Sequence, residues 1–234
     1  MSKFINNVDI SDSLIERPIG FSIKGKHFMV YHPTLGKVQL ISRLLEVIGF
    51  GQNVLPDIYS FCNIVVRQKR DECLRLIAYS TLPGKDCLDE NKVKRQLSLL
   101  KPIDDEDVAV LLITILSMDK SDAIMKHFGI DVESNRLSKV IKAKDDSKGA
   151  LDFGGKSVWG TMIDSACERY GWSFDYVLWG ISYSNLKLLL ADHIKTVFLT
   201  EEEKKKANVS TDGIVVRADE GDELERFINT RSWR

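Results

Sequence analysis

The chain has 234 residues, of which 44% are hydrophobic and 29% are charged, and its formal net charge is −1 at pH 7. This balance is typical of a soluble globular protein and excludes a strong overall attraction for nucleic acid or an anionic membrane, so we expect neither as a partner. No apolar run approaches the roughly 18–20 residues of a membrane span. Residues 1–13 lack the apolar core of a secretory signal, so we expect a cytoplasmic location.

The first 33 residues predict a flexible arm followed by a β-hairpin. Residues 1–17 are polar and mixed in character, as in an exposed arm. From Pro18 to Pro33, apolar residues alternate with polar ones on either side of Lys24-Gly25-Lys26. Alternation with a period of two is typical of strands, and glycine suits the tight turn between them. An isolated hairpin is only marginally stable, so we expect this one to pack against helices.

Apolar residues at helical spacing dominate the next part of the chain. Thr34 suits the cap of a helix that Gly49 ends. A long helix is expected from about Asp57 to Tyr79, and its charged residues 67–72 mark either a kink or a join between two helices.

Three more helix starts follow, each marked by acidic or small polar residues. These starts are Asp89 or Asn91, Asp104, and Asp119 or Ser121. The segment Val108–Leu116 is apolar on almost all sides. A helix that is apolar all round is a buried one, so we expect this helix to be the most buried of the chain.

The pattern changes in the second half of the chain. Residues 131–155 are rich in lysine and poor in periodic apolar residues, which predicts a linker or an exposed loop. Helical spacing returns after Ser157, with Val158 and Ala166 expected on the inner face. Residues 201–234 are charged, and we expect a short helical start that fades into disorder.

The stretch Tyr170–Asp192 is rich in aromatic residues, and we call it the aromatic corner. It holds two of the four tryptophans and three of the six tyrosines. Ser173 is placed to cap a short helix that Gly180 ends, and Ser182 or Ser184 is placed to cap a second helix. Large aromatic side chains bury much area at low rotamer cost, so we expect this corner to anchor the fold.

Together these patterns predict a mainly α protein, a multi-helix domain with a small N-terminal β-hairpin. The predicted segments are a flexible arm (1–17), a hairpin plus helical region (18–130), a linker or exposed loop (131–155), a C-terminal helical region with the aromatic corner (156–200), and a charged tail open to disorder (201–234).

We find no motif with the spacing of a catalytic, metal or cofactor site. The four cysteines form no CxxC pair, and no histidine has a metal-ligand neighbour at helical spacing. Gly155-Lys156-Ser157 resembles the end of a phosphate-binding loop, but position 150 is alanine where that loop needs glycine. The acids nearest the aromatic corner are Asp164, Glu168 and Asp175, and carboxylates near a helix start are more typical of caps than of catalysis.

Two stretches of the chain together resemble a known family. Arg17–Glu46 combines the hairpin with His-Pro-Thr-Leu-Gly-Lys and an apolar helix, and it resembles the opening of the tail assembly chaperones of long-tailed bacteriophages. Tyr170–Asp192 contains Tyr-Gly-Trp-Ser before a leucine-rich helix, and it resembles a C-terminal signature of related phage and prophage tail proteins.

The resemblance implies a binding function without catalysis. Such chaperones coat the long, helical, apolar tape-measure protein before the tail tube polymerises around it. This task needs a soluble helical protein with an apolar groove, and many weak copies along one client add avidity. Our hypothesis is that such a groove is lined or supported by Trp172, Tyr176, Trp179 and Leu186.

Two other interpretations of the function remain open. The first is a structural virion component, such as a tail adaptor or completion protein, which would place the chain in the virion. The second is a hydrolase that uses the acids near the aromatic corner. The sequence identifies neither the client nor whether the chain forms homo-oligomers.

Overall fold

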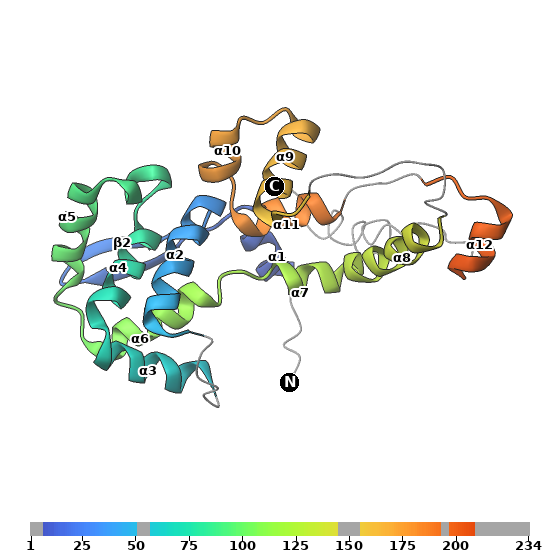
Figure 1. Cartoon of the computed structure of the whole chain (residues 1–234). Helices are drawn as coiled ribbons and strands as arrows, with labels where there is room; N and C mark the ends of the chain where they lie inside the picture. Colours follow the sequence, from blue (N-terminus) through green and yellow to red (C-terminus); the bar gives the residue numbers. More distant parts are fainter. Residues whose placement is uncertain (1–6, 51–56, 145–154, 193–196, 209–234) are drawn as a thin grey trace, which may run out of the picture. The chain divides into compact units, whose positions relative to one another are not determined.

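The structure is a computed structural model that describes residues 7–50, 57–144, 155–192 and 197–208. Within these ranges the chain forms twelve α-helices, one 3-10 helix and a two-stranded antiparallel hairpin (Figure 1). The predicted mainly α class with an N-terminal hairpin is confirmed.

The elements follow one another with short connections. The N-terminal ones are α1 (Asn7–Leu14), β1 (Ile19–Ile23), β2 (Lys26–Val30), α2 (Leu35–Ile48), α3 (Ile58–Gln68), α4 (Arg70–Thr81) and the 3-10 helix η1 (Gly84–Leu88). The later ones are α5 (Glu90–Leu100), α6 (Asp105–Leu116), α7 (Ser121–His127), α8 (Ile130–Ala143), α9 (Val158–Tyr170), α10 (Phe174–Trp179), α11 (Tyr183–Ala191) and α12 (Glu201–Ala207).

Several predicted helix starts are confirmed by side-chain caps. The carboxylate of Asp57 accepts a hydrogen bond from the Ser60 N–H at 2.7 Å and that of Asp104 accepts one from the Asp107 N–H at 2.9 Å. Asp89 caps α5 in the same way. A capping oxygen pairs with one of the first N–H groups of a helix, which have no partner inside the helix. The expected long helix is two helices, α3 and α4, that meet at Lys69.

The hairpin presents one apolar face to the helices. Phe21 lies opposite Phe28, and their rings stack with centroids 5.3 Å apart. Phe28 and Val30 are buried on this face, and the backbone N–H of Tyr31 donates to the carbonyl of Ser80 at the end of α4. The predicted turn consists of Lys24 and Gly25, which both have positive φ angles.

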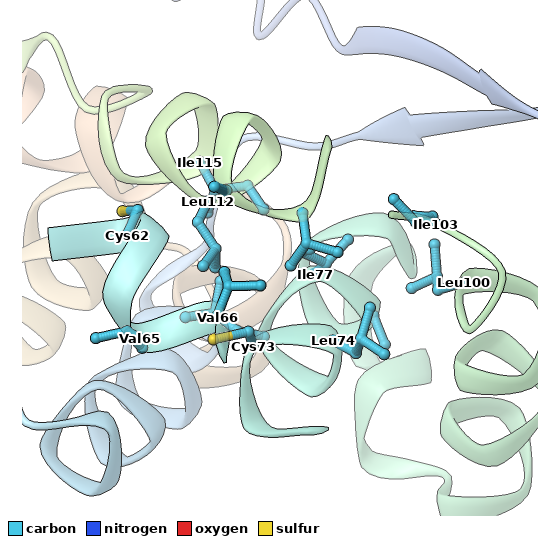
Figure 2. Close-up of a cluster of buried hydrophobic side chains, with 14 of the residues drawn as sticks. Cys62, Val65, Val66, Cys73, Leu74, Ile77, Leu100, Ile103, Leu112 and Ile115 are labelled. Carbon is cyan, nitrogen blue, oxygen red and sulfur yellow. The ribbon is translucent and has the colours of Figure 1, made fainter. Parts of the chain in front are cut away.

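The larger apolar core lies where α3, α4 and α6 meet. Figure 2 shows Val66 of α3, Ile77 of α4 and Leu112 of α6 directed into the same cluster. Cys62 and Cys73 are buried there as small hydrophobic side chains, and burial raises the pKa of the Cys62 thiol to about 11. The interior is therefore built from helix faces, with the hairpin packed on its edge.

The prediction of the most buried helix is wrong. In α6 the side chain of Val110 is half exposed, although Val108 and Leu112 are buried. Buried residues occupy almost the whole length of α4, from Cys73 to Thr81. The helix α4 is more buried because it packs against α2, α3, α5, α6 and β2. Even its polar residues Ser80 and Thr81 are buried, and their hydroxyls donate to carbonyls one turn earlier in the helix.

Two compact units divide the chain. The first comprises residues 1–124 and 154–193, and the second comprises residues 125–153 and 194–234. The helices α9, α10 and α11, which lie in the predicted C-terminal helical region (156–200), belong to the same unit as the hairpin. In the second unit, Val140 and Ala143 of α8 pack with Ala207 of α12.

The prediction of a linker or exposed loop over 131–155 is wrong for residues 131–143, which lie in α8. The apolar residues Ile130, Val140 and Ala143 are buried, while the neighbouring lysines are exposed and obscure the helical pattern. Residues 145–154 lie outside the described part of the chain.

The terminal predictions need similar corrections. Residues 7–14 of the expected flexible arm form α1, whose Ile10 and Ser13 are buried, and residues 1–6 lie outside the described part. Within the expected tail, α12 forms as predicted, with a capping box between Thr200 and Glu203. Residues 209–234 are not described.

Candidate protein-binding site

Short helices separated by capped turns shape the aromatic corner. Gly171 ends α9 with a φ angle of 65°, a left-handed conformation that suits glycine. The hydroxyl of Ser173 accepts a hydrogen bond from the Tyr176 N–H at 3.1 Å, and that of Ser182 accepts one from the Asn185 N–H at 3.2 Å. The predicted caps of α10 and α11 are confirmed, with Ser182 rather than Ser184 capping α11.

Gly180 has a role other than the expected left-handed helix end. Its backbone is right-handed, with φ −98° and ψ −29°. A Cβ atom at this position would collide with the ring of Tyr176. Glycine is therefore needed here for close approach and not for a positive φ angle.

Three rings form a ladder along the aromatic corner. Tyr170 stacks on Trp172 with ring centroids 4.6 Å apart, and Trp172 meets the edge of Tyr176 with centroids 5.1 Å apart. The hydroxyl of Tyr170 donates to the carbonyl of Leu189 in α11 at 2.9 Å, which ties the ladder to the next helix. Edge and offset contacts of this kind stabilise aromatic clusters beyond the area they bury.

One end of the ladder is exposed to solvent. Tyr176 is 44% exposed and Phe174 is 60% exposed, both on α10, while Trp172 is half-buried. The sequence pattern does not single out Phe174 as a site residue. A signal for it existed, since Phe174 is the first helical residue after the Ser173 cap, where a side chain has few neighbours of its own helix.

Trp179 points away from the ring ladder. Its indole lies on Gly36 of α2, so closely that a Cβ atom at position 36 would be only 2.7 Å from the ring. The same side chain packs with Tyr79, Leu82 and Val93 of the neighbouring helices. Trp179 therefore joins α10 to α2 as part of the core.

Leu186 is also a core residue. Its side chain is completely buried and packs with Leu35, Ala166 and Val177. Of the four predicted site residues, the structure brings Trp172 and Tyr176 together at the surface. Leu186 lies beneath and is completely buried, and Trp179 is partly buried against α2, so these two residues support α11 and α10.

A polar cluster holds α11 in place. The carboxylate of Asp119 accepts hydrogen bonds from the Ser121 N–H at 3.0 Å and the Ser184 hydroxyl at 2.9 Å, and it lies 3.5 Å from the ammonium of Lys187. Burial alone would raise the pKa of Asp119, but the hydrogen bonds and the Lys187 charge lower it below its ordinary value. Asp119 is therefore a structural anion.

A second polar contact connects the same helix to the N-terminal segment. The carboxylate of Glu16 accepts hydrogen bonds from the Ser182 N–H and the Asn185 side-chain amide, both at 2.9 Å. The Tyr183 N–H donates to the carbonyl of Pro33 at 2.8 Å. These contacts explain why residues that precede the hairpin are ordered.

Lys37 is the one fully buried basic side chain among the described residues. Its ammonium donates to the carbonyl of Leu82, the residue that ends α4, and burial lowers its pKa to about 8. A cation at the C-terminal end of a helix interacts favourably with the helix dipole. The sequence pattern does not predict this role, although Lys37 lies one helical turn before Ile41 on the apolar stripe of α2.

The acids considered for catalysis lie at the surface of the described part of the chain. Among the described residues, no three His, Cys, Asp or Glu side chains are grouped so as to hold a metal ion. Asp164, Glu168 and Asp175 are all exposed, and Asp175 is paired with Lys85. Ser157, in the Gly-Lys-Ser sequence, caps α9 by accepting a hydrogen bond from the Gly160 N–H.

Comparisons with known proteins give no assignment. No family model, no curated protein and no solved structure matches this chain. Among the described residues, no helix is both long enough and apolar enough to span a membrane.

Proposed function

We propose that this chain is a non-enzymatic assembly chaperone of a phage or prophage tail, acting in the host cytoplasm on the tape-measure protein. Two stretches that resemble such chaperones, and the mainly α fold with its N-terminal hairpin, support this proposal. The client would be a long chain of amphipathic helices, and the chaperone would bind it through apolar surface.

The exposed end of the ring ladder is the observation that carries the proposal. Tyr176, which contacts Trp172, is 44% exposed, and Phe174 on the same helix is 60% exposed, whereas the other rings of the corner are partly buried. Exposed aromatic side chains on a rigid, capped helix suit a partner that buries them, because aromatic residues are enriched at binding hot spots.

The test is retention of a tape-measure protein by the tagged chain after co-expression. We expect the double substitution Phe174→Ser and Tyr176→Ser to reduce retention at least tenfold while the circular dichroism spectrum stays unchanged. The matched control is Val158→Ser at the start of α9, outside the ring ladder. The prediction that Val158 lies on the inner face of this helix is wrong, because its side chain is 70% exposed, against 60% for Phe174 and 44% for Tyr176.

Two results would contradict the proposal. One is full retention of the client by the double variant, which would show that the ladder is not the binding surface. The other is recovery of the chain as a stoichiometric part of mature particles, which would favour the structural virion alternative.

A further inference from the structure

One edge of the hairpin has backbone groups without a partner in the described structure. Lys24 and Gly25 both have positive φ angles, which defines a two-residue turn of the type that closes tight hairpins. In such a hairpin the pair next to the turn, Ile23 and Lys26, exchanges hydrogen bonds, and the pairs alternate from there. Phe21 and Ile19 therefore bond to β2, while the N–H and C=O groups of Gly20 and Ser22 point outward.

Nothing in the described residues covers this edge. The backbone hydrogen bonds outside helices and strands include none to Gly20 or Ser22. Both residues are exposed, and the register runs from Ile19 to Ile23 without a bulge. Natural proteins usually protect an open edge by a bulge, a cover or an inward charge, because a free edge pairs readily with another strand.

The charged side chains at the turn end of this edge are basic. From Arg17 to Leu45 the sequence contains no aspartate or glutamate. Lys24 and Lys26 at the turn are exposed, and none of the ion pairs found among the described residues includes either of them. An acidic partner would therefore find complementary charge at the turn, whereas a second copy of β1 (Ile19–Ile23) would bring no acidic side chain to it.

The two faces of β1 define the pattern of the partner. Ile19, Phe21 and Ile23 lie on the apolar face, and Ile19 is 42% exposed. Gly20 and Ser22 lie on the opposite face and are small, so they leave room beside the backbone. An added strand would extend the apolar face with alternate apolar residues and would carry polar residues on the other face.

We propose that the free edge of β1 binds an extended acidic peptide segment of a partner protein by strand addition at Gly20 and Ser22. This surface is separate from the ring ladder, and it does not depend on the chaperone function proposed above. Main-chain hydrogen bonds supply the pairing, and Lys24 and Lys26 supply the preference for acidic sequence.

The test uses the full chain, labelled with ¹⁵N, and the probe peptide Ac-Glu-Val-Glu-Val-Glu-Val-NH2. We expect the amides of Gly20 and Ser22 to shift and to exchange with solvent at least tenfold more slowly when the peptide is added, while the amide of Phe21, already bonded to β2, changes little. Raising the salt concentration should weaken binding because the attraction is partly between charges.

Two variants test separately the contributions of the backbone edge and of the lysine charges to peptide binding. Ser22→Pro removes an outward N–H and leaves the backbone bonds of the hairpin in place, but it also removes the contact of the Ser22 hydroxyl with His27 Nδ1 at 2.7 Å, so Ser22→Ala is its matched control. The double substitution Lys24→Glu and Lys26→Glu leaves the edge intact and reverses its charge. We expect the proline variant and the charge-reversal variant each to raise the Kd for the peptide at least tenfold, with hairpin chemical shifts retained.

Three outcomes would overturn the proposal. Equal binding of a peptide N-methylated on alternate residues would exclude strand pairing. Peptide-induced shifts confined to the aromatic corner would place the site elsewhere. Protection of Gly20 and Ser22 that rises with protein concentration in the absence of peptide would identify a second copy of the chain as the occupant.

Discussion

Lys37 occupies a position on α2 where an apolar residue would be expected. Its neighbours Leu35 and Ile41 are buried core residues, and its own side chain is just as buried. The ammonium reaches the carbonyl of Leu82, and the Tyr31 ring lies 5.5 Å from it. A buried charge that is partnered costs less than an unpaired one, yet it still destabilises the fold relative to an apolar side chain of similar size.

This environment makes stability depend on pH in a defined direction. The folded pKa of Lys37 is about 8, against an ordinary value of 10.5. Between these values the unfolded chain binds the proton more tightly, so the free energy of unfolding rises as pH increases through this range. The shift corresponds to a gain on the order of 3 kcal/mol. Urea unfolding of the wild type at increasing pH should show this rise in the free energy of unfolding.

The matched variant for this prediction is Lys37→Met, which keeps the length of the side chain and removes the titrating group. The Lys37 charge acts on the pKa of the nearby Cys87 thiol, so both proteins carry Cys87→Ala to keep the remaining groups that titrate above pH 8 the same. The difference in unfolding free energy between the two proteins should therefore move in favour of the one that keeps Lys37 as pH rises. A difference independent of pH would show that burial does not lower the pKa of Lys37 in the folded chain.

At the scale of helices, local sequence signals predict where a helix begins better than they predict what the helix packs against. Asp89, Asp104, Ser157 and Ser173 were identifiable because an N-cap acts within its own turn. The helix α1 could not be predicted from local sequence. Its position depends on Glu16, which bonds to α11, and on the burial of Ile10. The burial of Trp179 depends likewise on the absence of a side chain at Gly36.

The contact between Trp179 and Gly36 leads to a test of how α10 is attached to α2. Gly36→Ala would place a methyl group against the indole ring, and overpacking of this kind costs about 1–3 kcal/mol. Gly160→Ala in α9 is the control. Its added Cβ would meet only ordinary contacts at 3.4 Å, and replacing a helical glycine by alanine stabilises by about 0.5–1 kcal/mol.

Chemical denaturation of the two alanine variants should therefore give changes of opposite sign. The double variant Gly36→Ala with Trp179→Leu should show less than the sum of the two single effects, because a smaller side chain at 179 relieves the collision. Additive effects would mean that the two residues are not in contact.

At the scale of the first unit, three apolar clusters share residues of α2. Leu35 packs with Leu186 and Val177 of the aromatic corner. Leu44 packs both with the cluster that contains Trp179 and with the core of α3, α4 and α6. Because α2 contributes to all three clusters, the hairpin, the central helices and the aromatic corner are expected to unfold together.

Leu186→Ala tests this cooperativity, since Leu186 is completely buried and lies far along the chain from α4. Loss of a buried leucine side chain costs about 2–5 kcal/mol. If the first unit is one cooperative structure, hydrogen exchange measured by mass spectrometry should accelerate by a similar factor in peptides from α4 and from α9–α11, because the most protected amides of both exchange through global opening. Val158→Ala, at an exposed position of α9, should leave the exchange rates of both sets of peptides unchanged. Acceleration confined to residues 158–191 would instead show that the aromatic corner opens by itself, and the surface offered to a client would then be controlled by that local opening.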